Sequence, residues 1–128
     1  MSLKTRDQPV VQFLQGWWPA LVMMAIIFFF SSLPSKSVPD FGKFEFSVKK
    51  GGHALGYLLL GRAFLYGIRP GKIAPWLALG LCILYAITDE IHQSFVPGRS
   101  PRVMDVGIDT LGTLLGLLPA MITLRRRG

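Results

Sequence analysis

The chain has little charge and almost no cysteine for its length. Only 16% of its 128 residues are charged, whereas a soluble domain usually carries about 25%. The single cysteine, Cys82, excludes a disulfide framework within one chain, and its apolar surroundings indicate a small core or lipid-facing residue. With 51% hydrophobic residues and a mean hydropathy of +0.45, we expect a single membrane domain over residues 1–128.

Four apolar stretches are long enough to form membrane-spanning helices. We place them at about residues 13–33, 50–68, 75–95 and 103–124, because about 20 helical residues cross a bilayer core. The second is the least regular, since Arg62 interrupts it and has to reach the far interface with its long side chain. A signal peptide is the alternative for the first stretch, but that apolar run exceeds the usual ~7–15 residues. The predicted fold is an all-α integral membrane four-helix bundle.

Basic residues are divided unequally between the two ends of this predicted bundle. The end that holds both termini has eight positive charges and one negative charge, whereas the other end is neutral overall. By the positive-inside rule, we expect both termini to lie in the cytoplasm. The net charge of +7 is then a topology signal, and we expect no nucleic-acid partner.

Polar side chains gather at the external end of the predicted bundle. On the second helix, Lys50, His53 and Tyr57 share one face at spacings of three and four. The candidate site residues come from three helices and one turn: Lys50, His53, Tyr57, Asp89, Glu90, His92, Gln93, Arg99, Arg102, Asp105 and Asp109. Ionisable groups beside a bilayer core are costly, so their common depth favours a functional pocket. The structural alternative is that single residues form ion pairs between helices or, as for Asp105, favour a helix dipole.

The residue types suggest roles within this pocket. We predict His53, Asp89 and His92 as catalytic or proton-handling groups, since a His–carboxylate pair can perform acid–base chemistry. The other candidates are predicted to bind a ligand, with Arg99 and Arg102 holding an anionic group. Metal binding is an open alternative, but neither HExxH nor paired CxxC is present, so the sequence assigns no metal site and no cofactor.

A pair of small residues marks one face of the fourth helix. Gly112 and Gly116 form a small-xxx-small pattern, and no nucleotide-binding strand precedes them. This pattern predicts close packing against another helix.

Four segments carry a family resemblance: SSLPS at 31–35, KGGHALGYLLLG at 50–61, YAITDEIHQSFVPGRSPRVMD at 85–105 and DTLGTLLG at 109–116. With these segments, of which DEIHQSFVPGR is the most specific, the chain resembles the VanZ-like family of small bacterial membrane proteins. The resemblance implies a multi-pass, four-helix domain in the bacterial cytoplasmic membrane. It also implies that the following residues stand at characteristic positions of the family: Lys50, His53, Tyr57, Asp89, Glu90, His92, Gln93, Pro97, Gly98, Arg99 and Asp105.

The chain departs from the family pattern at two positions. Lys49 stands where an acidic residue is common, and Asp109 stands where Asn is common. The first departure would weaken an ion pair with Lys50, and the second adds a carboxylate to the predicted site.

The family takes its name from an accessory glycopeptide-resistance protein associated with teicoplanin resistance, so the resemblance implies a role at the cell envelope. Our leading hypothesis is an outer-leaflet pocket that binds, and in one version modifies, an anionic lipid-linked or amphiphilic envelope ligand. The expected partners are membrane lipids and such a ligand or a glycopeptide. A small membrane enzyme, a transporter and a structural or partner-binding protein are the alternatives. Transport is disfavoured because transporters usually hold their ionisable sites near the midplane.

Overall fold

The chain is all-α in the parts that the structure describes. The computed structural model describes residues 8–32, 45–68, 70–98 and 103–127, with the side chains of the second helix described from Gly51 onward. The helices are α1 (Gln8–Ser32), α2 (Glu45–Gly67), α3 (Ala74–Gln93) and α4 (Val103–Arg127). The four-helix prediction is confirmed.

The helix limits differ slightly from the predicted spans. Both α1 and α2 begin five residues earlier than predicted, and α4 continues through the three terminal arginines to Arg127. The prediction followed the apolar stretches, whereas a helix continues into polar sequence until its backbone is interrupted.

Among the residues that the structure describes, three of the four helices are apolar enough to span a membrane. By length and composition these spans are Val10–Ser32, Ala74–Gln93 and Val103–Arg126. α2 is absent from this set. It contains Arg62, which made its stretch the least regular in the sequence, and also Lys50 near its start. The three apolar spans indicate a membrane protein.

Burial in this bundle is inverted relative to a soluble protein. Phe28, Phe29 and Phe30 expose 50–60% of their surface, whereas Asp89 and Asp109 are 3% and 1% exposed. In water, so large an apolar exterior would favour aggregation or association. In a bilayer, the apolar exterior meets lipid chains, and the polar groups gather between the helices.

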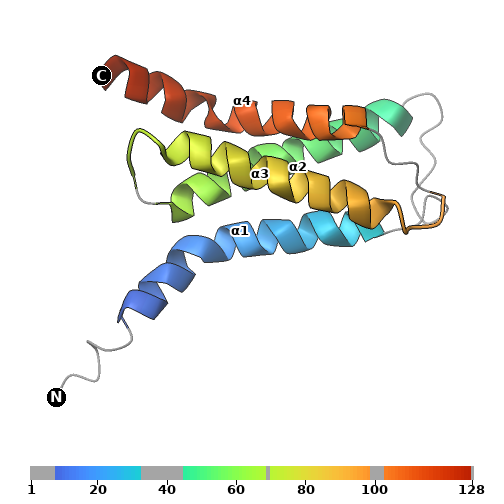
Figure 1. Ribbon diagram of the computed structural model, residues 1–128, viewed down its shortest axis with the longest axis horizontal. Coiled ribbons are helices and arrows are strands. Elements are labelled where there is room, and N and C mark those ends of the chain that lie inside the picture. The colour runs from blue at the N-terminus through green and yellow to red at the C-terminus, as the bar shows by residue number, and fades with distance from the viewer. Residues whose placement is uncertain (1–7, 33–44, 69, 99–102, 128) are drawn as a thin grey trace.

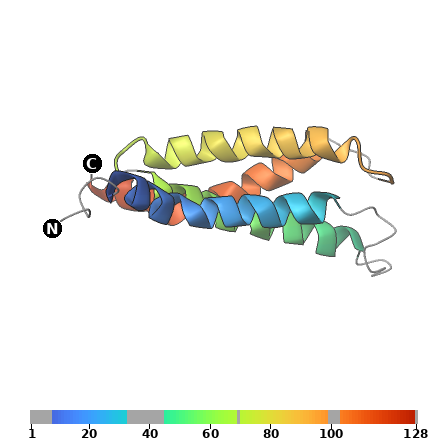
Figure 2. The ribbon, with the colours of Figure 1, turned by 90° about the horizontal axis from the view of Figure 1, so that it is seen from below.

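The central helices of the bundle are α2 and α3. Each of them contacts the other three helices, while α1 and α4 lie on opposite sides (Figure 1). The end of α1, the start of α2, the end of α3 and the start of α4 lie together at one end of the bundle (Figures 1 and 2). We call this the polar end, because most of the candidate site residues lie there.

Two prolines lie inside helices, near the opposite end. Pro19 interrupts α1 and Pro119 interrupts α4. A proline removes one backbone hydrogen bond and its ring displaces the preceding turn, so it bends a helix. The first turns of α1 and the last turns of α4 accordingly diverge from the bundle in Figure 1. The helices stay together toward the polar end.

The closest helix contact is between α2 and α4. A Cβ atom on Gly112 would overlap the carbonyl oxygen of Ala54, and one on Gly116 would overlap the carbonyl oxygen of Leu58. Only glycine lets the two backbones approach so closely. The packing prediction for Gly112 and Gly116 is confirmed, and this contact sets the register of α4 against α2.

Gly112→Ala should therefore destabilise the protein by about 1–3 kcal/mol, because the added methyl group forces the two backbones apart. Gly107→Ala is the matched control, since Gly107 is in the same helix and a Cβ there meets nothing within 4 Å. The control should be neutral or stabilising by up to about 1 kcal/mol through helix propensity. Thermal unfolding in detergent measures both, and equal stability of the two variants would contradict the close contact.

Candidate functional site

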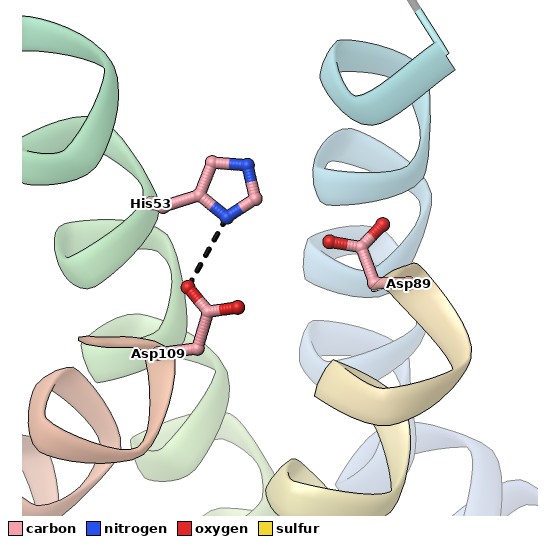
Figure 3. A group of neighbouring side chains, drawn as sticks. All are labelled: His53, Asp89 and Asp109. Carbon is pink, nitrogen blue, oxygen red and sulfur yellow. Dashed lines mark hydrogen bonds and ion pairs between the residues drawn. The ribbon is translucent and has the colours of Figure 1, made fainter. Parts of the chain in front are cut away.

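Three ionisable side chains from three helices converge at the polar end. His53 of α2, Asp89 of α3 and Asp109 of α4 place candidate ligand atoms within 4.8 Å of one another (Figure 3). The Nδ1 atom of His53 lies 3.2 Å from Oδ1 of Asp109. The carboxylate of Asp89 faces this pair from the other side. We call these three residues the polar centre.

The register of α4 against α2 explains the His53–Asp109 contact. His53 immediately precedes Ala54, and Asp109 lies one helical turn before Gly112, whose Cα approaches the Ala54 carbonyl. Residues one turn apart lie on the same helix face, so the glycine contact brings the imidazole and the carboxylate together.

The carboxylates of the polar centre are incompletely satisfied. Among the described residues, neither oxygen of Asp89 has a hydrogen-bond partner, and neither does Oδ2 of Asp109. Buried polar atoms are normally paired, because removing a charge from water without a partner costs several kcal/mol. Structural stability alone therefore does not account for this arrangement, which is typical of functional sites.

Two buried hydroxyl groups border the polar centre. The ring of Tyr57 stacks near that of His53 with centroids 6.2 Å apart, and Ser31 of α1 lies close to the Asp89 carboxylate, outside hydrogen-bonding geometry. Both side chains are fully buried. Within the described part of the chain, neither hydroxyl has a hydrogen-bond partner. They add two further polar groups that a ligand at this position would meet.

His92 lies apart from the polar centre and contacts α1. Its Nε2 atom is 2.8 Å from Oγ of Ser32, and its ring stacks on Phe28 with centroids 4.3 Å apart. The Ser32 hydroxyl has a single hydrogen, which it donates to the Phe28 carbonyl oxygen at 2.7 Å. We therefore assign the Nε2–H group of His92 as the donor to Oγ of Ser32. This histidine joins the end of α3 to the end of α1, and its catalytic role stays a prediction.

The other predicted residues fall into two groups. Three are buried at the polar end: Glu90, Gln93 and Asp105. Three lie outside the described side chains: Lys50, Arg99 and Arg102. The depth expected for the first group agrees with the structure, and ligand binding by either group stays a prediction.

Sequence reasoning did not assign two residues that position the site. Ser31 was not among the predicted site residues, although it begins the SSLPS segment that carries part of the family resemblance. Thr113 is fully buried. Its hydroxyl donates to the backbone carbonyl oxygen of Asp109 at 3.0 Å and lies 3.4 Å from the backbone carbonyl oxygen of Tyr57. The sequence feature that could have identified Thr113 is its position between Gly112 and Gly116, one helical turn after Asp109, which places it at the contact with α2.

A family model described as VanZ/LLP1 matches residues 16–124, a range that reaches all four helices. The chain belongs to the VanZ/LLP1 family. The resemblance found in the sequence is thereby confirmed, and all three residues of the polar centre lie within the matched range. Searches of curated proteins and of solved structures found no match. Membership of the VanZ/LLP1 family and the apolar helices together identify a membrane protein and agree with a place in the cell envelope.

Asp89→Asn should stabilise the ligand-free protein by on the order of 1 kcal/mol, because it removes a buried charge that has no partner among the described residues. Asp105→Asn is the matched comparison, since Asp105 is also buried but has an interaction partner and favours the α4 dipole. That variant should be less stable than the parent. Chemical or thermal unfolding in detergent measures both changes, and a clear loss of stability for Asp89→Asn would show that its carboxylate is structural.

Proposed function

We propose that this VanZ/LLP1 protein spans the bacterial cytoplasmic membrane with all four helices and acts on the cell envelope at its polar end. Both termini lie in the cytoplasm, and the polar end lies at the outer leaflet. There the polar centre binds an anionic lipid-linked or amphiphilic envelope ligand. Teicoplanin-type glycopeptide resistance is the phenotype to which this binding would contribute.

The distribution of charge supports this orientation. The end opposite the polar end holds the basic excess, including Arg125 and Arg126, which are exposed at the end of α4. Positive residues accumulate on the cytoplasmic side of membrane proteins. The neutral polar end then faces the cell exterior, where envelope precursors and glycopeptides are found.

The convergence of His53, Asp89 and Asp109 from three helices carries the proposal. Buried carboxylate oxygens without partners are costly in an apolar bundle, and hydrogen-bond donor groups of a bound ligand would complete their interactions. His53 has a half-buried position with 24% of its side chain exposed, so it is the member of the polar centre that an arriving ligand meets. The arginines Arg99 and Arg102 would hold an anionic headgroup at the membrane surface.

Acid–base catalysis is the second candidate, and the His53–Asp109 pair favours it. A carboxylate 3.2 Å from Nδ1 can orient an imidazole and stabilise its protonated form. The Nε2 atom would then exchange a proton with a bound substrate. Under this version the protein also modifies the ligand that it binds.

Single substitution of His53 or Asp109 by Ala should abolish the contribution of the protein to envelope-drug resistance, because either change removes part of the polar centre. Strains that express each variant at equal membrane abundance are compared with the parent and an empty vector for teicoplanin susceptibility. Thr88→Ala is the control, since Thr88 neighbours Asp89 in sequence but is exposed on the outer face of α3. Unchanged resistance in both site variants would contradict a functional polar centre.

A direct binding assay tests the class of ligand independently of the resistance phenotype. The parent protein in lipid nanodiscs should bind a fluorescent polyprenyl-diphosphate saccharide, and the His53→Ala and Asp109→Ala variants should bind it about tenfold more weakly or worse. Equal binding by parent and variants would exclude the polar centre as the site for that class of ligand.

A further inference from the structure

We propose that His53, Asp89 and Asp109 bind one divalent metal ion with a preference for nitrogen and oxygen ligands, of the Mn²⁺ or Zn²⁺ class. This inference deepens the proposed function, because it rests on the same three residues. It is tested without any envelope ligand.

The spacing of the three side chains fits a metal site. With metal–ligand bonds of about 2.1 Å, neighbouring ligand atoms are about 3.0 Å apart in an octahedron and about 3.4 Å apart in a tetrahedron. The 3.2 Å between His53 Nδ1 and Asp109 Oδ1 falls between these values. All three ligand atoms lie within 4.8 Å of one another, and opposite ligands of an octahedron are about 4.2 Å apart. Small side-chain rotations therefore suffice to close the set around one ion.

The burial of the carboxylates gives an independent reason for a cation. Asp89 and Asp109 are 3% and 1% exposed, and they point toward the same space (Figure 3). Three of their four oxygen atoms have no hydrogen-bond partner in the described part of the chain. Two like charges in such a position repel each other and lack solvation. A divalent ion neutralises both charges and satisfies the free oxygen atoms.

The donor set selects the class of ion. Two carboxylates and one imidazole are hard to borderline ligands, which suit Mn²⁺ and Zn²⁺, whereas Ca²⁺ usually takes six to eight oxygen ligands. Cys82, the thiol that would favour softer ions, lies elsewhere in the core and is absent from the metal-ligand group. Water molecules would complete the coordination. Because His53 is the partly exposed member of the set, we expect the ion to enter past its side chain.

A metal ion would also resolve a conflict within the proposed function. Two carboxylates repel an anionic headgroup, so the polar centre by itself is a poor site for such a ligand. A bound divalent cation neutralises both carboxylates and is itself the largest local charge, so the repulsion of an anionic headgroup is removed. It could then bind a phosphate or carboxylate oxygen of the ligand directly.

The first measurement is metal binding by the full-length protein, with any affinity tag removed and metals stripped by a chelator. Titration with Mn²⁺ or Zn²⁺ in detergent should give one ion per chain and a raised unfolding temperature that a chelator reverses. His53→Ala, Asp89→Ala and Asp109→Ala should each weaken binding about tenfold or more, since even groups that only support a metal ligand contribute 10–100-fold. Absence of stoichiometric binding by the parent would overturn the proposal.

Two control variants and a spectroscopic measurement distinguish the loss of a metal ligand from misfolding of a variant. Cys82→Ala removes the single thiol, and Thr88→Ala changes an exposed residue beside Asp89, so both should retain the ion. Electron spin-echo spectroscopy of Mn²⁺ bound to the parent protein should show coupling to one imidazole nitrogen, which ¹⁵N-histidine labelling identifies. Lack of that coupling, or its persistence in His53→Ala, would overturn the assignment even if other variants fail to fold.

The two proposals can fail separately. If the ion binds but the site variants keep full resistance and full binding of the polyprenyl-diphosphate probe, the metal site stands and the proposed function is wrong. If the variants lose resistance and probe binding while the parent binds no ion, the function stands and the metal site is wrong.

Discussion

The polar end of the bundle depends on how closely the backbones of α2 and α4 approach each other. Gly112 and Gly116 lie against the carbonyl groups of Ala54 and Leu58, where no larger residue fits. In a membrane, helices associate mainly through packing and interhelical hydrogen bonds, so small residues at the contact determine the register. This register places Asp109 beside the imidazole of the neighbouring helix. The chemistry of the site thus follows from a backbone contact one turn away.

The two buried carboxylates of the polar centre lower the stability of the fold, so their presence calls for a reason other than stability. Apolar side chains at Asp89 and Asp109 would pack the bundle without buried charge, which is often neutral or stabilising. The chain instead holds two buried carboxylates close to a histidine. Some nearby polar groups do have structural partners, such as the hydroxyl of Tyr85, which donates to the Met24 carbonyl oxygen at 2.5 Å. Hydrogen bonding therefore distinguishes the carboxylates of the polar centre, which have oxygens without a partner, from polar groups such as the Tyr85 hydroxyl that join the helices.

The sequence alone predicted the helices and the depth of the polar residues. Long apolar stretches and interruptions such as Arg62 determine where helices cross a bilayer, and helical spacing places residues on faces. The small-residue pattern also predicted the close contact of α4, although it did not identify α2 as the partner. These features depend on local sequence, which is why they could be predicted.

The composition of the polar centre could not be predicted in the same way. The sequence grouped His53 and Asp89 with His92, whereas the structure groups them with Asp109 and joins His92 to Ser32. Which side chains meet depends on the rotation of each helix about its axis and on its neighbours, and neither is encoded in local spacing. The same reason explains why no diagnostic metal motif appears in the sequence, since the three candidate ligands come from three different helices.

A structure of the full-length protein in lipid, determined with Mn²⁺ by anomalous X-ray diffraction, tests the central claim most directly. The account predicts one anomalous peak between His53, Asp89 and Asp109, about 2.1 Å from a ligand atom of each. A polar centre without such a peak, with both carboxylates paired to basic side chains, would contradict it.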